Sequence, residues 1–410
     1  MKSTLFTFLF MACMPMAMSA EVVDGINYSF NKENKTAEVA KSYYVDNVMI
    51  PEKVFFEGTE YTVNSIGEEA FANNYALTSV SMGNSVKSIG TEAFAGCPKL
   101  TTLSLSKNLE TIGDRAFWLC GSLHHIAIPN SVKTIGAEAF ANCSRLSHAF
   151  IGNGVTSIGK KAFAVCPKLT FVSIGNHVTS IADEAFSVCP NLTSVVMNVQ
   201  TPVAVDGNPF PKRTNMKLFI PQGNDVEAYR TAAYWKDFAS VEGREEQTCG
   251  KDAYWLYDKT KRTLIIYGNG DMADYDTDFS PWYTKDLDYR KLVVADGITH
   301  IGENAFMWGN MTTIQLPNSV RTIGMNAFEG CSALSFVNIP EGVESIGESC
   351  FSDCGSLLSV KLPNSLKEMG EETFRGCSSL DTIYLGNGLD TISSKAFDGC
   401  TSLTSVTLPK

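Results

Sequence analysis

The sequence predicts a β-rich solenoid of 23-residue repeats, with two arrays of parallel strands and short helical or 3₁₀ turns. One observation behind this prediction is a phenylalanine that recurs at a constant interval, stops, and then recurs again. The other is a set of apolar residues at fixed places within each interval. The phenylalanines that mark the repeat are Phe71, Phe94, Phe117, Phe140, Phe163 and Phe186, followed by Phe306, Phe328, Phe351, Phe374 and Phe397.

One repeat runs clearly from Ile89 to Leu105, and with Ile89 as position 1 its apolar residues occupy positions 1, 5, 6, 9, 12, 15 and 17. About a third of each unit is apolar, which is too little to enclose a core alone. Stacked units would turn each position into a continuous buried column, so such arrays need about three or more repeats. The sequence offers six units and then five.

Each unit contains a strand, a turn and a compact helical segment. The Leu-x-x-Leu-x-Leu run alternates with period 2 at its end, as a short strand with one buried face does. Turn residues such as Pro129-Asn130 and Pro317-Asn318 follow it. The Ala-Phe-x-x-Cys segment is too short for a free helix, which favours a helical or 3₁₀ turn. Stacking in register therefore predicts a parallel sheet along one side.

The first residues are typical of a secretory signal. Lys2 is followed by an apolar stretch, a helix-breaking Pro15 and small residues before a cleavage point, so 1–20 is the predicted signal peptide and Glu21 the mature start. In an alternative interpretation Cys13 is a lipidated lipoprotein site. No later stretch has the roughly 18 apolar residues of a membrane-spanning helix. The net charge of −11 argues against nucleic acid as a partner.

Most cysteines share one position of the repeat. Equivalent side chains in a column point the same way, whereas a disulfide needs two Cβ atoms turned towards each other. Their regular spacing also places them along a line, which does not suit a metal site. We therefore expect buried free thiols, with Cys249 and Cys350 outside the column. The column comprises Cys97, Cys120, Cys143, Cys166, Cys189, Cys331, Cys354, Cys377 and Cys400.

These units resemble the BspA-type class of leucine-rich repeats found on bacterial surface proteins. The unit from Ile135 to Cys143 carries the Ile-Gly-x-x-Ala-Phe-x-x-Cys pattern, and the match covers most of 65–197 and 292–410. The resemblance implies a curved leucine-rich-repeat solenoid, secreted or attached to the cell surface. It also implies adhesion to host matrix proteins or other cells, and binding rather than catalysis.

The rest of the chain is expected to cap or join the arrays. Tyr229, Trp235 and Phe238 have near-helical spacing, which suits a helix covering the open end of the first array. Further strands should precede each array. The predicted boundaries are 1–20 signal peptide, 21–64 N-terminal capping strands, 65–197 first array, 198–247 its C-terminal cap, 248–291 junction and second N-terminal cap, and 292–410 second array.

The junction contains a cluster of aspartates, Asp271, Asp274, Asp276 and Asp278. Calcium loops begin with alternating aspartates, but the glycine and distal glutamate of an EF-hand are missing at the required offsets. A solvated acidic loop is the main interpretation, and bound calcium is the alternative. We predict no cofactor.

Outward strand positions are the candidate binding sites. In the first array most are Ser or Thr, but three neighbouring units carry His124, His125, His148, Phe150 and Phe171. Because adjacent strands lie about 4.8 Å apart, His125, His148 and Phe171 should form one column. They are a candidate exposed binding patch. The alternatives are tolerated surface residues, packing beneath a neighbouring segment, and a transition-metal site.

The equivalent face of the second array is a further candidate contact region. Phe336, Lys361 and Tyr384 are its candidate ligand-binding residues. Other outward residues on this face are Gln315, Asn338, Leu358 and Asp381.

Catalysis has little support in the sequence. We find no Gly-x-Ser-x-Gly, His-Glu-x-x-His or P-loop pattern, and the remaining histidines, His177 and His300, lie beside repeat turns. The chain is predicted not to be an enzyme. The main hypothesis is an adhesin-like protein that recognises an extracellular protein ligand, and the alternative is a glycan-binding or structural envelope component.

The sequence ends at Leu408-Pro409-Lys410, directly after a predicted strand. An uncovered sheet edge can pair with another chain. We therefore expect either a homodimer formed through this edge or a longer relative in which the edge is covered.

Overall fold

The computed structural model describes residues 20–221, 224–244, 247–259, 261–276, 280–404 and 406. The predicted signal sequence before Ala20, with Cys13, lies outside these residues. So do Asp278 and the predicted C-terminal edge at Leu408-Pro409-Lys410. No helix within the described ranges is long and apolar enough to cross a membrane.

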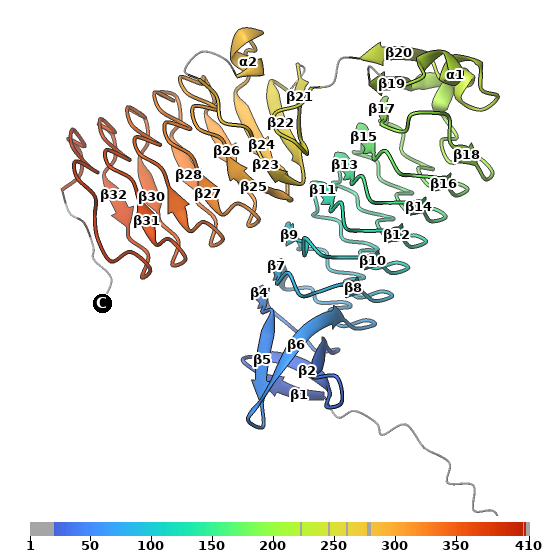
Figure 1. Cartoon of the computed structure of the whole chain (residues 1–410), viewed down its shortest axis with the longest axis horizontal. Helices are drawn as coiled ribbons and strands as arrows, with labels where there is room; N and C mark the ends of the chain where they lie inside the picture. The colour runs from blue at the N-terminus through green and yellow to red at the C-terminus, as the bar shows by residue number, and fades with distance from the viewer. Residues whose placement is uncertain are drawn as a thin grey trace, which may run out of the picture.

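The predicted solenoid is confirmed, and its strands form mostly parallel sheets on two flanks of each array rather than along one side (Figure 1). The longer strands of the first array are divided between two of these sheets. In the first array, longer strands form one flank: β4 (Asp46–Ile50), β7 (Leu77–Met82), β9 (Thr102–Ser104), β11 (His125–Ile128), β13 (His148–Ile151), β15 (Phe171–Ile174), β17 (Ser194–Met197), β19 (Lys217–Pro221) and β20 (Ser240–Arg244). Two-residue strands form the other flank: β8 (Ser88–Ile89), β10 (Thr111–Ile112), β12 (Thr134–Ile135), β14 (Ser157–Ile158), β16 (Ser180–Ile181) and β18 (Ala204–Val205).

A small set of strands starts the first array. They extend the sheet of two-residue strands, so the first repeat stacks on a preformed edge. These strands are β1 (Ala20–Val23), β2 (Ile26–Asn31), β3 (Thr36–Val39), β5 (Lys53–Phe56) and β6 (Thr59–Ile66).

The second array also has strands on two flanks, which form two sheets. One sheet contains β21 (Ala253–Asp258), β22 (Thr263–Gly268), β24 (Lys291–Val294), β26 (Thr313–Gln315), β28 (Phe336–Asn338), β30 (Ser359–Lys361) and β32 (Thr382–Tyr384). The other contains β23 (Gly270–Asp271), β25 (Ile298–Ile301), β27 (Thr322–Ile323), β29 (Ser345–Ile346) and β31 (Glu368–Met369). In Figure 1 this array runs from yellow to red.

The segment between the two sheets is a series of tight turns and not a regular helix. In one unit Ala95 N–H donates to Glu92 O at 3.0 Å, as in a 3₁₀ turn, but Glu92 has a φ of 54°. This left-handed residue interrupts helical geometry in every unit. Adjacent units are joined here by backbone bonds such as Phe94 N–H to Ala116 O at 2.7 Å. The prediction of a helical or 3₁₀ turn was therefore right in its hydrogen bonds and wrong in its regularity.

Each unit has a second left-handed position, and in two units of the first array a valine occupies it. The first array has Gly96 (φ 69°) and Asn142 (φ 62°) here, whereas Val165 and Val188 adopt φ 57° and 54°. A β-branched residue in this region is a genuine outlier, and the left-handed backbone costs roughly 1–2 kcal/mol. Val188 is 64% exposed, so its burial offsets little of this cost.

Replacing Val188 with asparagine should therefore raise the stability of the first array by about 1 kcal/mol, because asparagine tolerates the left-handed region. Urea unfolding followed by circular dichroism would measure the change. The matched control, Val188→Thr, keeps the branched Cβ and should give no gain. Equal stability of the two variants would show that the backbone is not strained.

Aromatic rings form a continuous stack through each array. Phe94 and Phe117, for example, lie 5.1 Å apart between centroids with an interplanar angle of 3°. The stack extends beyond the repeated phenylalanines to Phe210, which lies 4.7 Å from Phe186, and begins in the second array at Trp282, 5.0 Å from Phe306. Each of these extra rings is buried.

The repeated cysteines are free and buried, as expected. Each thiol of the column also donates to the carbonyl oxygen of the phenylalanine in the preceding unit, as in Cys97 Sγ to Phe71 O at 3.0 Å. Burial raises the pKa of the Cys97 and Cys143 thiols to about 12, which keeps both protonated. The column is therefore a set of hydrogen-bonded core residues.

The first array ends under a compact cover. It contains η1 (Arg213–Asn215), α1 (Val226–Thr231) and η2 (Trp235–Asp237), and Asp225 caps α1 by accepting from Ala228 N–H at 2.8 Å. Tyr229, Trp235 and Phe238 join the core of the array. Their polar atoms are satisfied, since Trp235 Nε1 donates to Val203 O at 2.9 Å.

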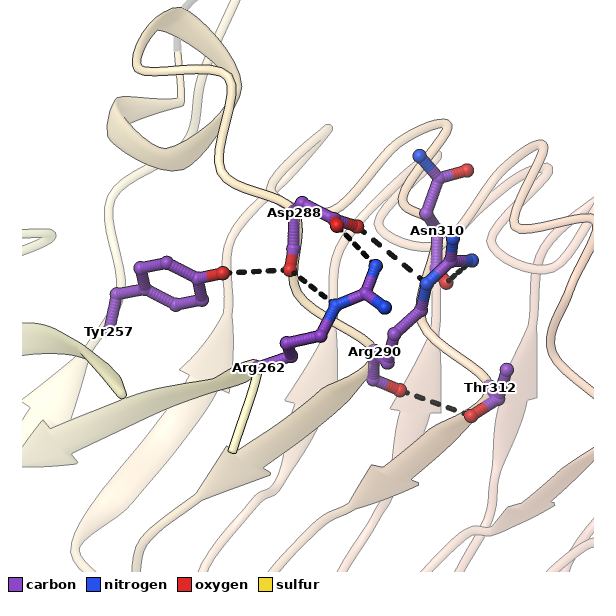
Figure 2. A network of polar contacts seen from close by, with 6 residues as sticks. All are labelled: Tyr257, Arg262, Asp288, Arg290, Asn310 and Thr312. Atoms are coloured by element: carbon purple, nitrogen blue, oxygen red, sulfur yellow. Dashed lines mark hydrogen bonds and ion pairs between the residues drawn. The ribbon is translucent and has the colours of Figure 1, made fainter. Parts of the chain in front are cut away.

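A polar network fixes the start of the second array, between α2 (Pro281–Thr284) and β24 (Figure 2). The Tyr257 hydroxyl donates to Asp288 O at 2.7 Å, and Arg262 pairs with the Asp288 carboxylate. Arg290 Nε lies 3.6 Å from the same carboxylate, and its Nη1 donates to Asn310 O at 3.1 Å. The Arg262 guanidinium lowers the pKa of Asp288. The network links β21, β22 and β24 to the first repeat.

Candidate binding surfaces

The first candidate column has the predicted register. His125 on β11 is paired with His148 on β13, and His148 with Phe171 on β15. The period of the repeat alone was therefore enough to place these three side chains in one row.

The column is covered and not exposed. His148, Phe150 and Phe171 are only 8%, 4% and 5% exposed, and the Tyr267 ring stacks on Phe150 with centroids 4.0 Å apart. The expectation of an exposed aromatic patch was therefore wrong, and packing beneath a neighbouring segment is what the structure shows. His125 is half-buried and His124 is exposed.

The physical reason is an inter-array core, in which outward side chains of both arrays pack face to face. It buries apolar area that strand periodicity assigns to solvent. The first array supplies Ala127, Phe150, Phe171 and Val196, and the second supplies Ile265, Tyr267, Val293 and Ala295.

The pKa values of the two histidines beside this core, His125 and His148, are strongly lowered. Desolvation, followed by Lys261, lowers the pKa of His148 to about 3, and desolvation with His124 lowers that of His125 to about 4. His148 Nδ1 is 2.8 Å from the Ser147 hydroxyl. Both rings are therefore neutral at neutral pH. Within the described ranges no group of three or more His, Cys, Asp or Glu residues is placed to hold a metal ion.

At the edge of the inter-array core the two arrays move apart and leave hollows between them. Asn269 marks this point, since its Nδ2 donates to Ile128 O at 3.3 Å and lies 3.5 Å from Asn130 Oδ1. Next to Asn269 is a hollow of about 450 Å³ lined by both arrays, which we call the inner hollow. Another hollow of about 450 Å³, which we call the outer hollow, lies between Thr78 of the first array and Lys361 of the second.

The second candidate face is exposed. Phe336, Leu358 and Tyr384 are 56%, 53% and 57% exposed, and Lys361 on β30 is paired with Tyr384 on β32. Lys361 and Asn338 also line the outer hollow. We refer to Phe336, Leu358, Lys361 and Tyr384 together as the outer face. This apolar and basic group borders a hollow that both arrays line, and its three large apolar side chains remain more than half exposed.

The acidic cluster has structural partners. Asp271 accepts from the Thr299 hydroxyl at 2.7 Å, and Asp274 accepts from Glu303 N–H at 2.8 Å. That backbone bond, with a smaller contribution from His300, lowers the pKa of Asp274. His300 Nε2 lies 3.2 Å from Asp274 and its Nδ1 2.6 Å from the Thr322 hydroxyl. These contacts link neighbouring turns of the second array.

Sequence reasoning missed the residues that define the contact between the arrays. Tyr267 and Asn269 lie in the predicted junction, and Asp296 lies in the predicted second array; none of the three was a candidate site residue. The available signal was that Leu264-Ile265-Ile266-Tyr267 and Leu292-Val293-Val294 are apolar on both faces, which is typical of strands covered on both sides. Later strands such as Thr313–Gln315 alternate.

Comparison with known families gives a match to the BspA type leucine rich repeat region over residues 64–193 and 299–410. No curated protein matches the chain.

Among solved structures, a leucine-rich repeat protein from Bacteroides ovatus is 26% identical, with 94% of each chain covered and a TM-score of 0.41. A leucine rich cell surface protein from Faecalibacterium prausnitzii is 24% identical over 94% of each chain, also with a TM-score of 0.41. A leucine rich repeat protein of T. pallidum is 27% identical, with a TM-score of 0.40, over 52% of this chain and 90% of its own.

Proposed function

Because the chain belongs to the family with the BspA type leucine rich repeat region, we propose that it is an exported, adhesin-like protein that binds an extracellular protein. The proposed contact surface is the outer face of the second array. Export is supported by the leader-like segment 1–20, and Cys13 gives the alternative of a lipid-anchored form.

The observation that carries this proposal is the exposure of three large apolar side chains beside a lysine on three successive repeats. Phe336, Leu358 and Tyr384 are each more than half exposed. Aromatic residues beside a basic group are typical of the residues that dominate protein interfaces. The stacked strands fix the backbone positions of this surface, which lowers the cost of ordering it when a partner binds.

The histidine column has no place in the proposed contact, because the second array covers it. Among the first-array candidates, His124 keeps an exposed ring at the margin of the inter-array core. Its pKa is lowered, chiefly by desolvation.

The test is binding of the full chain to a panel of extracellular matrix proteins, compared with a glycan array. Replacing Phe336, Leu358 and Tyr384 together with alanine should weaken protein binding by at least about 100-fold, because each side chain contributes contact area. Folding should be unchanged, since all three are exposed. Production with the leader, followed by mass spectrometry of the N-terminal peptide, distinguishes a start at Glu21 from lipidation at Cys13.

A matched triple variant changes three exposed aromatic residues in the N-terminal part of the first array, outside the outer face. Tyr43, Phe55 and Tyr75 are 64%, 65% and 59% exposed, and their alanine variant should bind as the parent does. Equal binding by both triple variants would contradict the proposed surface. Binding confined to the glycan array would favour the glycan-binding alternative.

A further inference from the structure

Asp296 is a buried carboxylic acid that lines the inner hollow. It follows β24 and is 7% exposed, and its Oδ1 is buried without a hydrogen-bond partner. A buried polar atom left unpaired costs free energy, so such atoms in native proteins call for an explanation.

At equivalent positions in other units, a side-chain oxygen accepts a hydrogen bond from a backbone N–H of the next unit. Asn130 Oδ1 accepts from Asn153 N–H at 2.7 Å, and Glu341 Oε2 accepts from Asn364 N–H at 2.9 Å. These bonds tie each turn to the next. Asp296 occupies the same place at the start of the second array, yet its Oδ1 makes no such bond.

The groups around Asp296 supply hydrogen-bond donors from both arrays. Lys107 of the first array lines the hollow and has no ion pair within the described ranges. Arg321 of the second array lines it too, with Nη1 donating to Asn318 O at 2.7 Å. Hydroxyl and amide groups complete the polar wall, and apolar side chains from the first array form the rest. The latter include Met82, Leu105 and Pro129.

A ligand for this hollow must donate to a carboxyl group and accept from cationic donors while resting on an apolar surface. Lys107 and Arg321 disfavour a cationic ligand, because they would repel it. Adjacent hydroxyl groups both donate and accept, and the C–H face of a sugar ring matches the apolar wall. The volume of about 450 Å³ lies within the range of small-molecule sites.

We propose that the inner hollow is a binding site for a short, hydroxyl-rich carbohydrate, with Asp296 accepting from ligand hydroxyls and Lys107 donating to ligand oxygens. The site requires both arrays, since Lys107 and Asp296 come from different ones. It is separate from the outer face and binds a different class of ligand.

The test is titration of the full chain with maltotetraose, cellotetraose, chitotetraose and tetragalacturonate, followed by NMR or calorimetry. Asp296→Asn and Lys107→Met should each weaken the tightest of these by about tenfold or more. The first replaces one carboxyl oxygen with an amide group that cannot accept a hydrogen bond, and the second removes a charged donor. Asp296→Asn restores the side chain found at equivalent positions, so it should fold normally.

Matched controls make the same substitutions elsewhere. Lys87→Met and Asp381→Asn lie outside the hollow and should leave saccharide affinity unchanged. The Phe336, Leu358 and Tyr384 triple alanine variant should also keep it, which separates this site from the proposed protein contact. The proposal is overturned if no tetrasaccharide binds, or if Asp296→Asn and Lys107→Met both bind as the parent does.

Discussion

Replacing Asp296 with asparagine is expected to stabilise the second array, by an amount that grows as the pH rises. Burial raises the pKa of Asp296 to about 8, far above its value of about 3.9 in an unfolded chain. The folded protein therefore holds a proton that the unfolded chain releases between these two pH values. Stability is lost as the pH rises through this window, and the loss is complete above pH 8.

The expected gain in stability follows from the difference between the pKa of Asp296 in the folded protein and its pKa in the unfolded chain. One pKa unit corresponds to about 1.4 kcal/mol, so the ionised carboxyl costs up to about 6 kcal/mol, and relaxation reduces this. We expect a gain of about 2 kcal/mol or more at pH 9 and only about a quarter of that gain at pH 5. Scanning calorimetry at both pH values measures it. Asp381→Asn, at an exposed position, serves as the control, and a gain independent of pH would contradict the assignment.

Mild acid is expected to separate the two arrays without unfolding them. Burial holds the pKa of His148 at about 3, whereas the released ring would titrate near 6.5. The separated state therefore takes up a proton that the docked state excludes, so docking is strongest above pH 6.5 and weakens as the pH falls towards 3. At pH 4.5 His148 alone contributes about 2 to 3 kcal/mol against docking.

Most of the surrounding charged and titratable groups also lower the pKa of His148. His125, Lys261 and Lys291 disfavour protonation of His148, and Asp258 is the opposing group. Small-angle scattering should show a larger radius of gyration at pH 4.5 than at pH 7, with an unchanged far-ultraviolet circular dichroism spectrum. His148→Leu should stay docked to lower pH. If that variant opens at the same pH as the parent, His148 is not the responsible group.

The repeat unit could be predicted from the sequence because one physical requirement recurs many times. Every turn must bury the same positions against its neighbours, so the Phe94 ring, the Cys97 thiol and the Leu103 strand position follow from a period that eleven units share. The outward row of His125, His148 and Phe171 followed from the same period. The segment that covers this row could not be inferred from the period.

The parts that could not be predicted depend on contacts between distant segments. Phe150 and Tyr267 are far apart in the chain, and nothing in the repeat fixes how one array lies against the other. The caps add irregular spacing: Phe210 follows Phe186 by one residue more than the period, yet its ring continues the stack. Asp296 could be recognised as unusual only after its equivalents were seen to bond to the next turn.

The most direct test of face-to-face docking is the reactivity of individual histidines in the full chain at pH 7. Diethylpyrocarbonate modifies accessible neutral imidazole rings, and His177 is an exposed internal reference. Docking predicts that His148 reacts far more slowly than His177, and that Tyr267→Asp, which places a charge in the inter-array core, brings His148 close to the rate of His177. Equal rates for His148 and His177 in the unmodified chain would contradict docking of the arrays.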